Sequence, residues 1–207
     1  MTNSDYFKKG EVIIQDLSSS LIPKVLDVSR NMTVLDACSA PGTKTQEIAM
    51  FMQNEGEIIA QDIYEKRVQL IDHLMLKTGV SIVKAKVQDS SILNEEYINK
   101  FDRVLLDAPC SGLGDLRHKP EIRFHLKPDN IDELTSLQKK LLEVNGQYVK
   151  EGGILVYSTC TLNKKENEKQ IQTFLKNHSE YELIEEKTLF PYIENSDGFY
   201  YAKMRRK

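Results

Sequence analysis

Cysteine is scarce in this chain, and its few positions are far apart. Three cysteines occur among 207 residues, at Cys38, Cys110 and Cys160. An odd number of widely separated cysteines argues against a disulfide framework, and no pair has the Cys-x-x-Cys spacing that is typical of zinc sites. The four histidines are also distant from the cysteines in the sequence. We therefore expect no metal site, and we expect reduced thiols in a cytoplasmic protein.

The sequence also lacks a long apolar run, a leader and an excess of basic residues. No apolar run approaches the roughly 18 residues that a membrane-spanning helix needs, and residues 1–16 do not have the layout of a signal peptide. The formal net charge is −3. Because phosphate neutralisation dominates nucleic-acid affinity, this balance argues against a protein that binds nucleic acid through its overall charge. Any RNA affinity must come from a local patch or from a segment outside these residues.

Short β-type segments alternate with longer helical patterns along the chain. This alternation predicts an α/β fold, with a mostly parallel sheet covered by helices on both faces. The predicted strands are 33–37, 57–62, 81–86, 101–108, 153–159, 181–186 and 198–204. The predicted helices are 44–53, 64–77, 131–150 and 164–176. Asn163 and Glu166 have the spacing of a capping box at the start of the last helix. The final two strands have no long helix between them, which predicts an antiparallel hairpin at one edge.

The chain has the organisation of one domain. No repeat, low-complexity tract or linker divides it, and a content of 40% hydrophobic residues is enough for a substantial core. We expect the domain at residues 33–207, preceded by a helical extension at residues 1–32. The apolar pattern LSSSLIPKVLDV at 17–28 predicts a helix that packs on the sheet.

Unusual residues lie where the predicted strands end, which in a parallel sheet is the ligand-binding edge. The first strand ends in DACSAPGTKT (36–45), whose small residues form a tight turn, although only Gly42 matches the GxGxxG pattern of dinucleotide sites. The second strand ends in Asp62, which can accept the hydroxyls of a ribose or cap the next helix. Asp89 follows the third strand, where adenine contact and an ordinary turn are equally compatible with it.

Two further strand ends carry thiols. The fourth strand ends in LLDAPCSGLGDLR (105–117), which contains Asp107 and Cys110, and the fifth ends in YSTC, which contains Cys160. One cysteine in a loop is usually inert. Two cysteines at neighbouring strand ends, beside a carboxylate, are not explained by packing, so we expect all three side chains to face one site.

The segments DACSAPGTKT, DAPCSG and YSTCTLNKKENE resemble the motifs of the RsmB/Sun family of RNA cytosine-5 methyltransferases, in order from VIIQDLSS (12–19) to DGFYYAKM (197–204). The resemblance implies a Rossmann-like fold, S-adenosylmethionine as methyl donor, and a cytosine of small-subunit (16S) ribosomal RNA as acceptor. The cofactor-binding residues that it implies are Cys38, Ser39, Ala40, Pro41, Gly42, Thr43, Lys44, Asp62, Asp89 and Asp107.

The chain departs from the family pattern in two places. Thr43 replaces a glycine that is usual in the family loop, and this replacement is costly if the position needs a positive φ. The family's N-terminal RNA-binding portion has no counterpart in these residues. The resemblance therefore implies that these residues form a catalytic domain. The lack of the RNA-binding portion accounts for its slightly acidic net charge.

The chemistry of cytosine methylation accounts for the two cysteines of the family. Carbon 5 of cytosine is a poor nucleophile until a thiolate attacks carbon 6, and cysteine is both a strong nucleophile and a good leaving group. The resemblance assigns the attack to Cys160, proton removal and release to Cys110, and hydrogen bonding of the base to Asp107. A rival assignment makes Cys110 the nucleophile, because DNA cytosine methyltransferases attack with a cysteine that follows a proline.

The segment LRHKPEIRFHLK (116–127), just after Cys110, combines basic and aromatic residues. Such loops suit single-stranded RNA, although a solvated surface loop has the same composition. We expect RNA contacts from Arg117, Lys119, Arg123 and Lys127.

Three other functions remain compatible with parts of the pattern. A non-catalytic RNA- or adenosine-binding module would keep the fold but would not use two aligned cysteines. A nucleotide-dependent oxidoreductase would require the missing GxGxxG. A thiol redox protein would join Cys110 and Cys160 in a disulfide. Transfer RNA is the alternative substrate for a methyltransferase of this type, and we expect a monomer.

Overall fold

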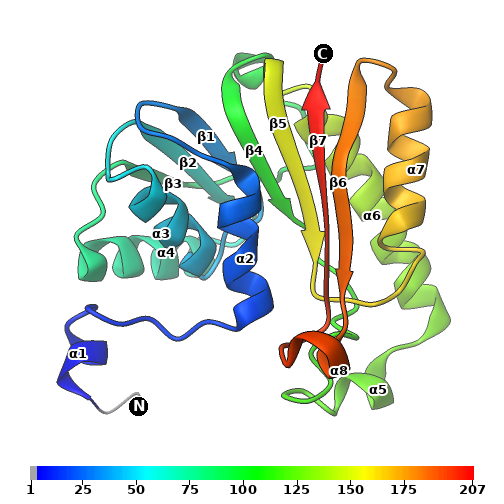
Figure 1. Ribbon diagram of the computed structural model, residues 1–207, viewed down its shortest axis with the longest axis horizontal. Helices are drawn as coiled ribbons and strands as arrows, with labels where there is room; N and C mark the ends of the chain where they lie inside the picture. Colours follow the sequence, from blue (N-terminus) through cyan, green and yellow to red (C-terminus); the bar gives the residue numbers. More distant parts are fainter. Residues whose placement is uncertain (1–3) are drawn as a thin grey trace.

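The computed structural model describes residues 4–207 and has a central sheet with helices on both faces (Figure 1). The strands are β1 (Thr33–Asp36), β2 (Glu57–Asp62), β3 (Val83–Val87), β4 (Phe101–Asp107), β5 (Val149–Thr159), β6 (Tyr181–Leu189) and β7 (Phe199–Arg206). The helices are α1 (Asp5–Lys8), α2 (Leu17–Leu26), α3 (Thr43–Phe51), α4 (Glu65–Thr78), η1 (Glu95–Tyr97), α5 (Ile122–His125), α6 (Pro128–Gly146), α7 (Glu168–Asn177) and α8 (Pro191–Glu194).

The seven strands form one sheet in the order β3-β2-β1-β4-β5-β7-β6. Strands β1 to β5 are parallel to one another, whereas β7 is antiparallel to both β5 and β6. The predicted α/β fold with an antiparallel pair at one edge is therefore confirmed. Within the described residues, no helix is long and apolar enough to cross a membrane.

Alternate residues of the central strands face opposite layers of helices. In β5, Ile154 and Val156 belong to the core that includes residues of α2 and α3. Leu155 and Tyr157 belong to the core that includes residues of α6 and α7. All four are buried, and burial of each such side chain is worth about 1.5–3 kcal/mol. The period of two along the strand thus places one helical layer on each face of the sheet.

Most predicted elements differ from the structure by a few residues at their ends, and two helices differ in ways that have a clear physical reason. The predicted helix 131–150 ends at Gly146, and Val149 instead begins β5. Val149 pairs with Phe101 of β4, and both side chains are fully buried, so sheet pairing outweighs the helical pattern of the sequence. The predicted helix 164–176 begins later, at Glu168. The expected capping box is therefore wrong, because the side chain of Glu166 is engaged elsewhere.

Candidate active site

A cleft of about 430 Å³ opens at the carboxyl ends of the strands. Strand order reverses at this place, because β1 pairs with β2 on one side and with β4 on the other. Ligands of open α/β sheets bind at such a switch point. Side chains from the ends of β1 to β5 line the cleft, among them Cys38, Asp62, Asp89, Asp107, Cys110 and Cys160. The structure therefore brings the chemically unusual strand ends of the sequence together.

The loop after β1 forms the tight turn that its small residues predict. Gly42 has φ +103°, and its N–H donates to the carbonyl of Ser39 at 2.8 Å. A side chain at Gly42 would be strained in this conformation, and its Cβ would lie 3.3 Å from the Cα of Ile71. Cys38 and Ala40 line the cleft. Burial raises the pKa of the Cys38 thiol well above its ordinary value, which disfavours the thiolate there.

Thr43 occupies an ordinary helical position. It is the first residue of α3, and it is not among the non-glycine residues with positive φ. The positive φ of the loop belongs to Gly42 instead, so threonine at position 43 has no backbone cost. Five of the predicted cofactor residues are not part of the described lining of the cleft: Ser39, Pro41, Gly42, Thr43 and Lys44.

Asp62 lies at the end of β2, where both of its predicted uses are possible. Its side chain is buried at the wall of the cleft, and its Oδ1 accepts the N–H of Tyr64 at 3.2 Å just before α4. Arg67 lies 3.4 Å from Oδ2. Asp89 also lines the cleft, while its Oδ1 accepts the N–H of Ser91 at 2.8 Å. Each carboxylate thus has a local hydrogen bond and a place at the cleft.

Asp107 is fixed by two polar partners at the end of β4. The ammonium of Lys44 lies 2.7 Å from Oδ2, and the hydroxyl of Ser158 donates to Oδ1 at 2.8 Å. Burial lowers the pKa of Lys44, but the adjacent Asp107 carboxylate outweighs this effect, and the pKa is raised overall. Lys44 therefore stays protonated. Its ammonium lies against Asp107, although the sequence placed Lys44 in the cofactor loop.

Cys110 and Cys160 meet beside Asp107 at the cleft. Their Sγ atoms are 3.3 Å apart, from loops that follow the adjacent parallel strands β4 and β5. The hydrogen bond between the two thiol groups, together with burial, raises the pKa of Cys110 well above its ordinary value. The raised pKa favours the protonated form of Cys110, and either sulfur can be the donor in their hydrogen bond. This arrangement favours Cys160 as the sulfur that is free to attack.

Comparisons with known proteins identify the family. The sequence profile of the family described as 16S rRNA methyltransferase RsmB/F matches residues 23–205. This chain belongs to that family. The membership confirms the family predicted from the motifs, and with it S-adenosylmethionine as the predicted cofactor.

Similar proteins in the family are longer than this chain. "Probable ribosomal RNA small subunit methyltransferase B" of Bacillus subtilis is 38% identical over 225 residues, which cover 100% of this chain and 50% of that protein. "Ribosomal RNA small subunit methyltransferase B" of Yersinia enterocolitica is 35% identical over 212 residues, which cover 97% of this chain and 48% of that protein. The chain thus spans about half the length of these curated relatives.

Solved structures share the whole fold. NSun6 from Pyrococcus horikoshii, crystallised with SFG, has a TM-score of 0.92 and 30% identity, and the match covers 100% of this chain and 56% of that chain. A methyltransferase homolog protein from the same organism has a TM-score of 0.89 and 33% identity, with 100% and 72% of the two chains covered. These matches confirm the Rossmann-like methyltransferase fold.

Two buried acids of this RsmB/F-family chain were missed by the sequence analysis. Glu166, six residues after Cys160, is fully buried and hydrogen-bonds the backbone and the side chain of Ser111. Asp36, at the end of β1, is 1% exposed, and burial raises its pKa to about 7 although a hydrogen bond from Thr45 opposes the shift. The signal for Asp36 was available, because it opens the motif DACSAPGTKT. The local spacing of Glu166 pointed to a helix cap instead.

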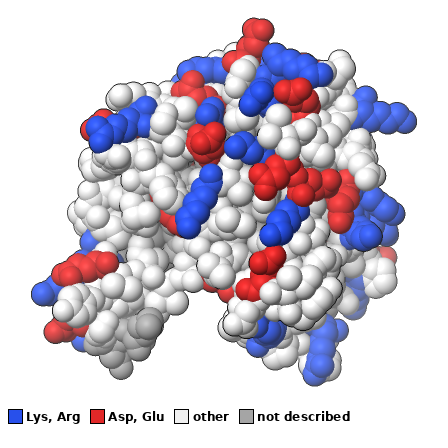
Figure 2. Space-filling model, in the orientation of Figure 1, with Lys and Arg blue, Asp and Glu red and all other residues white. Residues whose placement is uncertain are grey.

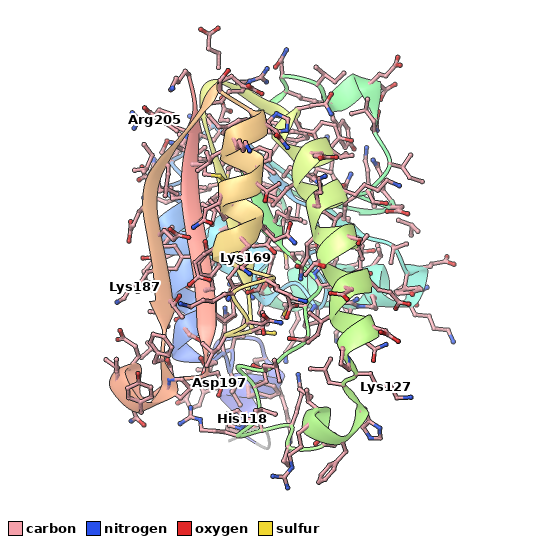
Figure 3. All side chains as sticks on the ribbon, turned by 90° about the vertical axis from the view of Figure 1, so that its right-hand side faces the viewer. His118, Lys127, Lys169, Lys187, Asp197 and Arg205 are labelled. Atoms are coloured by element: carbon pink, nitrogen blue, oxygen red, sulfur yellow. The ribbon has the colours of Figure 1, made fainter. Side chains whose placement is uncertain are left out.

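The four predicted RNA-binding residues lie in the segment between β4 and α6, with Arg123 in α5, and none of them lines the described part of the cleft. Arg117 is paired with Asp197 at 3.3 Å, and Lys119 is paired with Asp115 at 3.2 Å. The guanidinium of Arg123 lies 4.6 Å from the ring centroid of Phe124. Lys127 precedes α6 and points outward, away from Asp197 (Figure 3). Blue side chains lie at this lower end of the molecule in Figure 2, where Figure 1 places α5 and α8.

One group of possible metal ligands lies near the same loop. Ligand atoms of Asp16, His118 and Asp197 are within 4.8 Å of one another, and Figure 3 shows His118 and Asp197 side by side. These carboxylates already have other partners. Asp16 accepts the N–H of Ser18 at 2.9 Å as the N-cap of α2, and Asp197 is paired with Arg117. The group therefore stabilises the contact between α2 and the loop before β7.

Proposed function

We propose that this chain transfers a methyl group from S-adenosylmethionine to carbon 5 of a cytosine in small-subunit ribosomal RNA, through a transient bond between Cys160 and the base. The observation that carries the proposal is the pair of sulfurs, 3.3 Å apart, beside Asp107 at the cleft. The names of the curated relatives support ribosomal RNA of the small subunit as the substrate.

The donor set of the cleft fits the cofactor. Asp62 presents a buried carboxylate that suits ribose hydroxyls, and the turn at Gly42 brings the backbone close to the cleft. Asp89 and Asp107 add acidic groups, which suit a cation. When bound, S-adenosylmethionine supplies an electrophilic methyl group on a positively charged sulfur.

Cys160 carries the covalent step. Its thiolate forms a bond to carbon 6 of the cytosine, which breaks the conjugation of the ring and makes carbon 5 nucleophilic. After carbon 5 is methylated, the carbon 5 proton leaves and the bond from carbon 6 to sulfur breaks. Cys110 assists both events: its thiol gives a proton to the departing sulfur, and the resulting Cys110 thiolate takes the proton from carbon 5. The Cys160 thiol then loses a proton to solvent, which is the one proton that the overall reaction releases.

Asp107 and Lys44 serve the base. The Asp107 carboxylate can accept a hydrogen bond from the amino group of cytosine, because Ser158 and Lys44 fix the orientation of the carboxylate. The ammonium of Lys44 places a positive charge beside the ring, where electron density accumulates after the attack at carbon 6. Preorganised charges of this kind are usually the largest contribution to catalysis.

The two cysteines are distinguished by the covalent complexes that their variants form. Cys160→Ala should abolish methyl transfer from labelled cofactor to small-subunit ribosomal RNA without forming a protein–RNA adduct. Cys110→Ala should accumulate an adduct that survives denaturing electrophoresis, because release is impaired. Adducts in Cys160→Ala but not in Cys110→Ala would exchange the two roles.

Absence of an adduct in both variants, with cofactor binding intact by calorimetry, would overturn the covalent mechanism. Mapping the methylated position in the RNA then tests the substrate and the cytosine separately. Methylation of transfer RNA instead would retain the chemistry and change the substrate.

A further inference from the structure

A buried carboxylate lies between the two cysteine loops. Glu166 is fully buried. Its Oε2 accepts the backbone N–H of Ser111 at 2.8 Å and the side-chain amide of Gln138 at 3.1 Å, and its Oε1 accepts the hydroxyl of Ser111 at 2.6 Å. A buried carboxylate without such donors would cost several kcal/mol. Its place inside the fold therefore depends on this one set of partners.

The residues that follow each cysteine are joined to each other. Ser111 comes directly after Cys110, and Thr161 comes directly after Cys160. The hydroxyl oxygens of Ser111 and Thr161 are 2.8 Å apart, and that of Thr161 is 3.4 Å from Oε1 of Glu166. All three side chains are buried. One carboxylate thus ties together the backbones of both cysteine loops.

The sheet and the helices hold this group in turn. The Gln138 amide of α6 also donates to the carbonyl of Pro109 at 2.9 Å, so the residues on both sides of Cys110 are anchored. The hydroxyl of Tyr157 in β5 donates to the backbone carbonyl of Glu166 at 2.6 Å. The sulfur of Cys110 therefore has little freedom to move away from Cys160.

We propose that Glu166 is a positioning residue that sets the separation of the two sulfurs. Its carboxylate contacts neither thiol and acts through Ser111 and Thr161. The consequence for catalysis rests on the proposed function: loss of this spacing should impair the release step in which Cys110 takes part. The claim about the spacing itself does not depend on that function.

Disulfide formation measures the separation of the sulfurs without RNA or cofactor. A diazene oxidant such as diamide converts the two thiols to a disulfide and is itself reduced to a hydrazine, so two electrons and two protons are transferred. The rate is read as the loss of free thiols at Cys110 and Cys160 by mass spectrometry under non-reducing conditions. The wild-type chain should form the disulfide rapidly, because its sulfurs are 3.3 Å apart.

Glu166→Ala should slow this reaction by about tenfold or more, which corresponds to about 1.4 kcal/mol in the barrier. Glu166→Gln should be intermediate, because its amide oxygen can still accept the N–H of Ser111. Glu168→Ala is the matched control: Glu168 lies two residues along the chain, hydrogen-bonds Thr188 at 3.5 Å, and should leave the rate unchanged. Equal rates in Glu166→Ala and the wild type would overturn the proposal.

A second pair of variants keeps the test decisive if Glu166→Ala fails to fold. Thr161→Val removes the hydroxyl that links the loops, and Thr161→Ser retains it. Slower disulfide formation in Thr161→Val, restored in Thr161→Ser, supports the proposal, and equal rates in both overturn it. With RNA, Glu166→Ala should also accumulate the covalent adduct, as Cys110→Ala should. Slow disulfide formation without an adduct supports the positioning role and counts against the proposed reaction instead.

Discussion

Asp36 should make the stability of this chain depend on pH. The residue ends β1, is 1% exposed, and accepts the hydroxyl of Thr45 at 2.7 Å through Oδ2. Its Oδ1 is buried and has no hydrogen-bond partner among residues 4–207. Burial, and to a lesser extent the nearby carboxylate of Asp107, raises the pKa of Asp36 from its ordinary value of 3.8 to about 7. The ionised form is therefore costly in the folded state.

The size of the effect follows from this difference. One pH unit corresponds to 1.36 kcal/mol, so about three units make the fully ionised state roughly 4 kcal/mol less stable than the protonated one. The sign follows from proton binding. Between about pH 4 and pH 7 the folded chain holds the proton that the unfolded chain has lost, so the free energy of unfolding falls as pH rises through this window. Above pH 7 both states are ionised, and the dependence levels off.

Asp36→Asn removes the titration but retains an oxygen that can accept the hydroxyl of Thr45. The free energy of unfolding of this variant, relative to wild type, should therefore increase by roughly 2–3 kcal/mol between pH 5 and pH 8. Urea unfolding at the two pH values measures this change. Asp72→Asn, at an exposed position of α4, is the matched control and should show no comparable change. If the difference between Asp36→Asn and wild type is the same at pH 5 and pH 8, burial does not suppress the ionisation of Asp36.

Two further substitutions, each with a control variant, test contacts of the site. A Cβ on Gly114 would lie 1.8 Å from the backbone oxygen of Gly198 and 2.8 Å from the carbonyl oxygen of Cys160. Gly114→Ala should therefore lower the free energy of unfolding in urea by about 1–3 kcal/mol, and it should also reduce the rate of methyl transfer. At Gly79 an added Cβ would meet open space, but φ is +71°, so Gly79→Ala should lower the free energy of unfolding by about 1–2 kcal/mol. It should leave the rate of methyl transfer unchanged. Equal losses of activity in Gly114→Ala and Gly79→Ala would contradict the role of the Gly114 contact. Lys44→Met should lower kcat by about 100-fold or more through the loss of the ion pair with Asp107, with partial recovery in Lys44→Arg. If Lys44→Met binds the cofactor more weakly by calorimetry but has a normal kcat, Lys44 binds the cofactor, as the sequence predicts, and does not act on the base.

The neighbouring positions of the two cysteine loops could be predicted because they follow from sheet geometry. The carboxyl ends of parallel strands share one edge, and Cys110 and Cys160 come after strands β4 and β5, which pair directly. The same reasoning predicted that Asp62 and Asp89 lie at the cleft, where the structure places them. Each of these positions is fixed by the backbone of a strand end, so the period and order of the strands were sufficient.

Side chains that reach across the site could not be predicted in the same way. Glu166 hydrogen-bonds Ser111, which is 55 residues away in the sequence, and its local spacing suggested a helix cap instead. Lys44 stands in the cofactor loop, but its long side chain extends to Asp107 on another strand. In both cases the partner is set by side-chain reach in the folded chain, and the sequence near the residue contains no signal for it.

The acidic groups of the cleft and the basic residues of the loop at 116–127 lie in different parts of the site. The cleft gathers carboxylates from β2, β4 and the loop after β3, which suits the positive sulfur of the methyl donor but repels phosphate. The basic residues of the loop at 116–127 lie outside the described lining of that cleft, and two of them are partly neutralised by Asp115 and Asp197. Over the face shown in Figure 2, acidic and basic side chains are interspersed. The acidic groups of the cleft therefore suit the cationic cofactor of the proposed reaction. Under the proposed function, phosphate contacts are therefore expected from this basic segment, outside the acidic cleft.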